Sequence, residues 1–236
     1  MIHYKKKYSQ LIWLVPVGMM FIVFSFNSSK STLESEEIPR EQFLDFLLDG
    51  NDRFTKKNPV HFGQNKMRTN NHNQGQHPGA AIISCADSRV SPELVFDQGL
   101  GDLFVIRNAG NIVGANEIGS VEFAIEYLGV PLVIILGHTN CGAIGAFVEH
   151  DHDHSHIYPE NIQKIIDFID AEEEEKALIR TSPNFFEKAV EANVLHGIHA
   201  LKASIPSIDS LINNGKLRVV GAVYNMESGK VKILEE

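Results

Sequence analysis

The chain has 236 residues, 43% of them hydrophobic, and a formal net charge of −9 at pH 7. This length is ample for one α/β domain with its own core. The acidic balance and the lack of a basic stripe argue against nucleic acid as a partner. The only cysteines are Cys85 and Cys141, which excludes a disulfide-rich scaffold.

The first 27 residues have the order of an export signal. Lys5, Lys6 and Lys7 precede an apolar stretch over residues 11–26, and small polar residues follow. The stretch is short for a membrane span. We therefore expect a signal peptide over 1–27 that exports the protein to the periplasm. The alternative is an uncleaved signal anchor, which would be the only membrane contact. A linker is expected over 28–38 and the folded domain over 39–236.

The segment that opens the domain predicts a helical arm. Apolar residues recur with helical spacing between residues 41 and 54 and would form one apolar face. These residues are Phe43, Leu44, Phe46, Leu47 and Phe54.

Three short apolar runs, over 79–84, 103–106 and 131–137, end abruptly in polar residues. Continuous apolar runs of this length are typical of buried parallel strands. Between the second and third runs, residues 116–128 have the apolar spacing of a helix. Alternating strands and helices predict an α/β fold with a central, mostly parallel β-sheet flanked by helices. Residues 217–234 predict a C-terminal hairpin that adds an edge strand to this sheet.

Side chains that bind metals follow the first and third runs: Cys85, Asp87, His138 and Cys141. Thiolate, imidazole and carboxylate groups bind zinc, and four of them fill a tetrahedral site. The carboxyl ends of parallel strands meet at one edge of a sheet, so the two halves can come together. The alternatives for the thiols are a disulfide or two inert buried cysteines. Neither explains why Asp87 and Arg89 lie beside one thiol and His138 beside the other, which favours one Zn²⁺ per chain.

The same residues form two spaced motifs. Cys85, Asp87 and Arg89 make a Cys-x-Asp-x-Arg run, and His138 and Cys141 make His-x-x-Cys. The pair of motifs resembles the β-class carbonic anhydrases. Further segments that look like this family lie at residues 41–54, 105–111, 126–127 and 221–224.

The resemblance implies a zinc-dependent catalytic domain over residues 39–236 that reversibly hydrates carbon dioxide to bicarbonate and a proton. It assigns catalytic roles to Asp87 and Arg89. Asp87 would close the site as a fourth zinc ligand, and when paired with Arg89 it would leave room for water and orient the attacking zinc-bound hydroxide. The fork of the Arg89 guanidinium suits a carboxylate and should keep Asp87 ionised. The alternative is a surface ion pair without consequence.

The resemblance also assigns substrate binding to Gln76, Phe104, Tyr127 and Gly142. Some of these residues would come from a neighbouring subunit of a homodimer or homotetramer. From the residue types alone, Phe104 and Tyr127 could simply fill a hydrophobic core, whereas core packing gives no reason for the polar Gln76.

An inhibitory bicarbonate site known in some members needs a Trp where this chain has Ile82, although Arg107 matches its Arg. This departure indicates the plant-like subtype, in which Arg107 would support the fold or the dimer.

Three interpretations stay open. The same zinc site could hydrolyse carbon disulfide or carbonyl sulfide, or the protein could store zinc without catalysis, which would not need Arg89. The tract His150–His156 could gather metal, relay protons or be a solvated loop. The run Glu172–Glu175 is expected on a solvated helix face.

Overall fold

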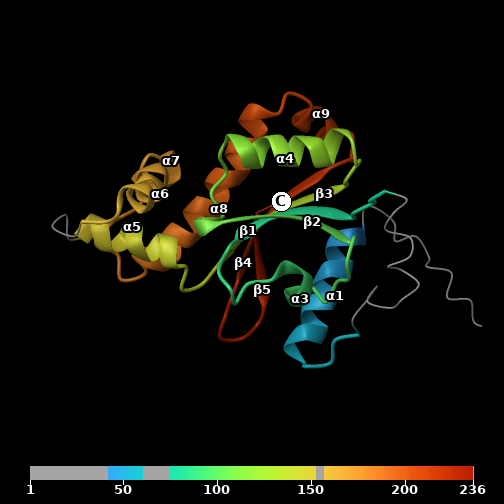
Figure 1. The fold of residues 1–236 in the computed structure, drawn as a ribbon, viewed down its shortest axis with the longest axis horizontal. Helices are drawn as coiled ribbons and strands as arrows, with labels where there is room; N and C mark the ends of the chain where they lie inside the picture. The colour runs from blue at the N-terminus through green and yellow to red at the C-terminus, as the bar shows by residue number, and fades with distance from the viewer. Residues whose placement is uncertain (1–41, 61–74, 153–156, 236) are drawn as a thin grey trace, which may run out of the picture. The chain divides into compact units, whose positions relative to one another are not determined.

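The computed structural model describes residues 42–60, 75–152 and 157–235, and Figure 1 shows their arrangement. The expected signal peptide, the linker and most of the histidine tract lie outside these residues. Within the described ranges, no helix has both the length and the apolarity needed to cross a membrane.

The centre of the fold is a five-stranded sheet in the order β2-β1-β3-β4-β5. The first four strands are parallel, and β5 runs antiparallel to β4. Every residue of β1 and β3 is buried, which explains their unbroken apolar sequence: a strand covered on both faces has no polar side. The predicted mostly parallel α/β sheet and C-terminal hairpin are confirmed. The strands are β1 (Ala80–Cys85), β2 (Leu103–Asn108), β3 (Leu132–His138), β4 (Arg218–Tyr224) and β5 (Val231–Glu235).

The helices of the described ranges include both predicted ones, near residues 41–54 and 116–128. The full set of helices in these ranges is α1 (Phe43–Thr55), α3 (Pro92–Val95), α4 (Ala115–Glu126), α5 (Gly142–His152), α6 (Glu160–Asp170), α7 (Glu173–Lys176), α8 (Phe185–Ser204) and α9 (Ile208–Asn213), with a 3₁₀ turn η3 (Ala109–Asn111).

The two faces of the sheet are covered by different helices. Successive side chains of a strand point to opposite faces. Ala81 and Ile83 of β1 therefore belong to a core formed with α4, α8 and α9, whereas Ala80 and Ile82 belong to a core formed with α1 and α3. Figure 1 shows α4 and α9 on one side of the sheet and α1 and α3 on the other. The domain is thus a three-layer structure.

A third apolar cluster lies where the sheet meets α5, α6 and the first half of α8. It contains both cysteines, packed with Ile144, Phe147 and Phe185 among others. In Figure 1, α5, α6 and α7 extend beyond one end of the sheet. The cysteine thiols therefore lie at the junction between the sheet and this helical extension.

The expectation that Glu172–Glu175 lies on a solvated helix face is wrong for two of its residues. Glu172 is 3% exposed and Glu175 is 0% exposed, while Glu173 is exposed. α7 packs against α8, and residues three apart share one helix face, so Glu172 and Glu175 turn inward together. Nothing in a run of four acidic residues indicates that another helix will pack over two of them.

Candidate active site

The predicted ligands come from the carboxyl ends of two neighbouring strands. Cys85 ends β1 and His138 ends β3, and Ser84 pairs with Leu136, so the two strand ends are adjacent. β2 lies on the far side of β1 and β4 on the far side of β3, so the chain leaves these two strand ends in opposite directions. In open α/β sheets such a point leaves a crevice in which ligands bind.

The loop between the second and third ligands is fixed by the C-terminal hairpin. The backbone N–H of Thr139 donates to the carbonyl of Tyr224 at 3.0 Å, and the Thr139 hydroxyl accepts from the backbone N–H of Met226, also at 3.0 Å. Asn140 has φ 57°, the left-handed conformation that asparagine tolerates. This tight turn brings Cys141 back toward His138.

Cys85, His138 and Cys141 are brought together as predicted. One ligand atom from each lies within 4.8 Å of the others, and all three residues are buried. In the described part of the chain, no other set of three His, Cys, Asp or Glu side chains meets this spacing. Zn–S bonds of about 2.3 Å and Zn–N bonds of about 2.0 Å place tetrahedral ligand atoms roughly 3.3–3.8 Å apart. The group therefore needs little contraction to hold one ion.

The imidazole of His138 is oriented as a metal ligand. Its Nδ1 lies 2.9 Å from the carbonyl oxygen of Thr139, which can only accept, so Nδ1 carries the proton. Nε2 is then a lone pair, buried and without a hydrogen-bond partner among the described residues. Metal-bound histidines use the same arrangement, in which one ring nitrogen donates to the protein and the other binds the ion. Two thiols and this orphaned nitrogen are a donor set that fits Zn²⁺.

Both thiols are free, not joined in a disulfide. The hydrogen bond from the Cys141 thiol lowers the pKa of Cys85 to about 4, against the opposing effect of burial. The same interaction, together with burial, raises the pKa of Cys141. The pair therefore favours one thiolate even without a cation, and a bound metal would hold both thiols deprotonated.

Asp87 is held by Arg89 and not by the three-ligand group. The Arg89 Nε donates to Asp87 Oδ1 at 3.0 Å and its Nη2 donates to Oδ2 at 2.8 Å. The Arg89 backbone N–H also donates to Oδ1, at 2.9 Å. These contacts hold the pKa of Asp87 well below its usual range. The arrangement corresponds to the paired form of the dyad, and Asp87 as a fourth zinc ligand stays a prediction.

Arg107 fixes the backbone between Cys85, a candidate metal ligand, and Asp87, the partner of Arg89. Its Nε donates to the carbonyl of Cys85 at 3.0 Å, and its Nη2 donates to the carbonyl of Asp87 at 2.7 Å. The sequence suggested only a general supporting role for this residue. A cation near the end of a strand that pairs with β1 is the signal that could have placed it beside the site.

Gly110 contributes a backbone donor that the sequence reasoning missed. Its N–H donates to the sulfur of Cys85, with 3.4 Å between N and Sγ. Gly110 has φ 78°, and a Cβ there would come within 2.9 Å of the Ala143 Cβ. Glycine is therefore required at this turn. The position lies inside a segment that resembles the family, but only the fold shows which amide faces the thiol.

The proposed substrate-binding residues divide into two groups. Gly142 follows Cys141 directly. Gln76 precedes β1, Phe104 is the second residue of β2, and Tyr127 follows α4. Phe104 lies four residues before Asn108, the partner of Cys85, which is about 13 Å along a strand.

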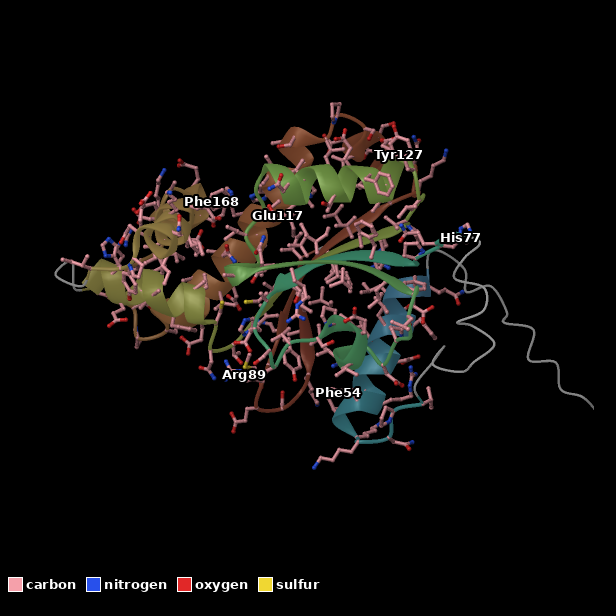
Figure 2. The ribbon with its side chains drawn as sticks, in the orientation of Figure 1. Phe54, His77, Arg89, Glu117, Tyr127 and Phe168 are labelled. Atoms are coloured by element: carbon pink, nitrogen blue, oxygen red, sulfur yellow. The ribbon has the colours of Figure 1, made fainter. Side chains whose placement is uncertain are left out.

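These last three residues thus lie at the amino ends of the strands. Figure 2 shows Tyr127 and His77, the neighbour of Gln76, far from Arg89. Within one chain, the structure does not bring Gln76, Phe104 or Tyr127 to the ligand group.

The sequence and fold are similar to those of known enzymes. A family model described as carbonic anhydrase matches residues 80–231. Carbonic anhydrase 2 of Mycobacterium tuberculosis is 34% identical over 186 residues, which cover 78% of this chain and 87% of the relative. The carbonic anhydrase of Pseudomonas aeruginosa is 35% identical over 170 residues, covering 68% and 74% of the two chains.

Solved structures give the same picture. The Coccomyxa β-carbonic anhydrase in complex with acetazolamide has a TM-score of 0.60 and 29% identity, covering 81% of this chain and 86% of its own. The β-carbonic anhydrase CcaA has a TM-score of 0.61 and 27% identity, covering 83% and 92%. The residues matched by the family model include Cys85, His138 and Cys141.

Proposed function

Because this chain belongs to the carbonic anhydrase family, we propose that it hydrates carbon dioxide reversibly to bicarbonate and a proton at a zinc site. The solved relatives place the fold in the β class. The observation that carries the proposal is the buried Cys85–His138–Cys141 group with the Asp87–Arg89 pair beside it. The candidate metal ligands and the Asp87–Arg89 pair thus lie together at the carboxyl end of the sheet.

The donor atoms for Zn²⁺ would be Cys85 Sγ, His138 Nε2 and Cys141 Sγ. When bound, zinc supplies acidity, because it lowers the pKa of a coordinated water to about 7 and makes hydroxide available at neutral pH. Three protein ligands are the number typical of catalytic zinc sites, whereas structural sites have four. Asp87 as an additional, reversible ligand would switch the site between these two classes.

Asp87 would orient the oxygen nucleophile. Its carboxylate stays ionised because Arg89 donates to both of its oxygens, and an ionised carboxylate can only accept hydrogen bonds. A nucleophile that donates its proton to Asp87 must turn a lone pair away from it. We infer that this lone pair faces the carbon of carbon dioxide, so that Arg89 contributes by fixing Asp87.

The decisive experiment is stopped-flow hydration of carbon dioxide by the full, zinc-loaded chain and by Arg89→Ala. We expect the variant to retain zinc and to lose hydration by roughly a hundredfold or more, as when other positioned proton-accepting groups are removed. Lys164→Ala, which removes an exposed ion pair to Glu160 at 2.7 Å, is the control and should keep full activity. Undiminished hydration by Arg89→Ala would contradict the dyad mechanism.

The same assay separates the rival functions. Carbonyl sulfide and carbon disulfide are supplied alongside carbon dioxide. Zinc bound at unit stoichiometry with turnover of the sulfur compounds alone would reassign the site to their hydrolysis. Zinc bound without any turnover would reassign it to metal storage.

We also propose that Gln76, Phe104 and Tyr127 serve the active site of a second copy in a homodimer or homotetramer. Tyr127 is 80% exposed and stacks on the partly exposed Phe123, with ring centroids 5.3 Å apart. Phe123 in turn packs on Phe104 of β2, an edge strand of the sheet, with ring centroids 6.3 Å apart. An aromatic surface next to a strand edge is a surface that proteins usually cover.

Two further proposals rest on the sequence. The order of basic, apolar and small polar residues over 1–27 supports export to the periplasm, with an uncleaved anchor as the alternative. Ile82, in place of the Trp of the inhibitory bicarbonate site, supports the plant-like subtype. The contacts of Arg107 with two backbone carbonyls agree with a supporting role in that subtype.

A further inference from the structure

The turn that donates to the Cys85 sulfur is itself anchored from α8 by one buried side chain. We propose that Asn193 is a positioning residue of the metal centre: it holds Gly110 by its carbonyl, so that the N–H of the same residue stays directed at the Cys85 sulfur. This inference rests on the proposed zinc site and names a residue that neither motif of that site contains.

A chain of two hydrogen bonds joins three elements. The Asn193 Nδ2 on α8 donates to the carbonyl of Gly110 at 2.8 Å. The N–H of the same glycine donates to the Cys85 sulfur at the end of β1, at 3.4 Å. Asn193 is 2% exposed and Cys85 is 5% exposed, so solvent does not compete for either bond. The two bonds lie on the two peptide groups that flank the Gly110 Cα, so a movement of the Asn193 amide reaches the N–H that faces Cys85 through the backbone of a single residue.

Asn193 uses only its donor function here. Its Oδ1 is buried and has no hydrogen-bond partner in the described ranges. Burying an amide oxygen without a partner costs free energy, and an apolar side chain of similar size would avoid this cost. The donor bond to Gly110 is thus the contact that offsets the cost of placing an asparagine at this position.

The turn needs an anchor because its backbone is unusual. Gly110 has φ 78° and Asn111 has φ 47°, so two consecutive residues lie in the left-handed region. Such conformations persist where surrounding contacts over-determine them. Besides Asn193, the Asn108 side chain donates to the Ile112 carbonyl at 2.8 Å and closes the turn from the other side. Without the Asn193 donor, the peptide group that carries the Gly110 carbonyl can rotate, and Gly110, with no Cβ to restrict its backbone, can shift its N–H away from the sulfur.

The N–H···S bond has a chemical consequence. A donor aimed at a thiolate draws negative charge from the sulfur, and hydrogen bonds of this kind tune metal–thiolate centres. Asn193 would therefore control metal retention and the electronic character of the Cys85 ligand without touching the metal. A side chain that merely fills space on α8 would have no such effect.

The test uses the full chain loaded with ¹¹³Cd²⁺. In the wild-type protein, the Gly110 amide proton should show scalar coupling to the metal, transmitted through the N–H···S bond. Asn193→Leu should abolish this coupling, and zinc should be lost to a competing chelator about tenfold more readily, in the range known for outer-shell residues. Asn193→Ala removes the same donor without adding bulk or charge, and it gives the same test where the leucine variant fails to fold.

Asn51 offers a matched control. It is also a buried asparagine, 5% exposed, and its Nδ2 donates to the carbonyls of Val95 and Gly229 at 3.1 and 2.8 Å, in the core on the α1 side of the sheet. Asn51→Leu should lower stability but preserve both the coupling and zinc retention.

The outcomes distinguish the two proposals. Coupling and zinc retention that persist in both Asn193 variants would overturn the role of Asn193, as would a cadmium-loaded wild-type protein without coupling. A wild-type chain that binds neither zinc nor cadmium would overturn the metal site itself.

Discussion

Two arginines control Asp87 through different atoms. Arg89 donates to the carboxylate, whereas Arg107 donates to the backbone carbonyls of Cys85 and Asp87. The orientation of the side chain and the path of the backbone are therefore fixed independently. Because each arginine acts on a separate part of the residue, their contributions can be separated by substitution.

Replacing Arg107 by lysine keeps the charge but removes the planar fork that reaches two carbonyls. We expect one of the two hydrogen bonds to be lost, at a cost of about 1 kcal/mol in the free energy of unfolding. Zinc content should stay at one per chain while hydration falls, because the segment between Cys85 and Asp87 shifts. Urea denaturation, metal analysis and stopped-flow assays check these points. If Arg107→Lys hydrates carbon dioxide at the wild-type rate, Arg107 is not needed to place Asp87.

At the scale of elements, the acidic run at α7 does not behave as an exposed charged surface, because two of its carboxyl groups are buried. Burial raises the pKa of Glu172 to about 10 and that of Glu175 to about 8. Apart from the hydrogen bond that joins the two carboxyl groups to each other, their oxygens have no donor among the described residues. His196 approaches Glu172 at 3.8 Å through Nε2, but its Nδ1 is bonded to Glu174 at 2.7 Å. The two inward carboxyls are therefore held in protonated form near neutral pH.

This arrangement predicts a pH dependence of stability. A carboxyl whose pKa is higher in the folded state binds more protons there, so the free energy of unfolding falls as pH rises from its ordinary pKa to its folded pKa. The loss should begin near the ordinary pKa of 4.5 and extend to about pH 8 for Glu175 and about pH 10 for Glu172, with at most about 1.4 kcal/mol per pH unit for each group. Urea denaturation of Glu172→Gln/Glu175→Gln should show a flatter profile than the wild-type protein.

Glu173→Gln provides the control, because this neighbour is exposed and should leave the pH profile unchanged. Parallel profiles for the wild-type protein and the double variant would show that the buried pair does not retain its protons.

At the scale of the whole molecule, the sequence predicted those features that depend on residues close together along the chain. The strands could be predicted because β1 and β3 are buried on both faces, and the candidate ligands because each lies at the end of one of these strands or just after it. The inward turn of Glu172 and Glu175 depends on the packing of α7 on α8, which a run of glutamates does not encode. Asn193 lies 83 residues from Gly110 along the chain, so only the fold makes them partners.

Self-association is testable at Tyr127. Tyr127→Ser should lower the mass measured by sedimentation and reduce kcat/KM, because the exposed aromatic surface would no longer cover the site of a second copy. Zinc content should not change, since the ligands come from another part of the chain. Ile179→Ser, at a residue 73% exposed in the turn after α7, is the control and should keep the wild-type mass. An unchanged mass for Tyr127→Ser would place the contact elsewhere.

The two strands that carry the ligands also determine when metal can be captured. β1 and β3 are neighbours in the sheet but are separated along the chain by β2 and α4, so an unfolded chain holds Cys85 far from His138 and Cys141. Metal would then bind only after these strands pair, and a ligand that enters late stabilises the native state without stabilising the transition state. Saturating zinc should therefore slow unfolding and leave the refolding rate unchanged, as stopped-flow fluorescence with and without a chelator can measure. Zinc would stabilise the sheet only after it has formed, and the rate at which the sheet forms would depend on chain topology alone.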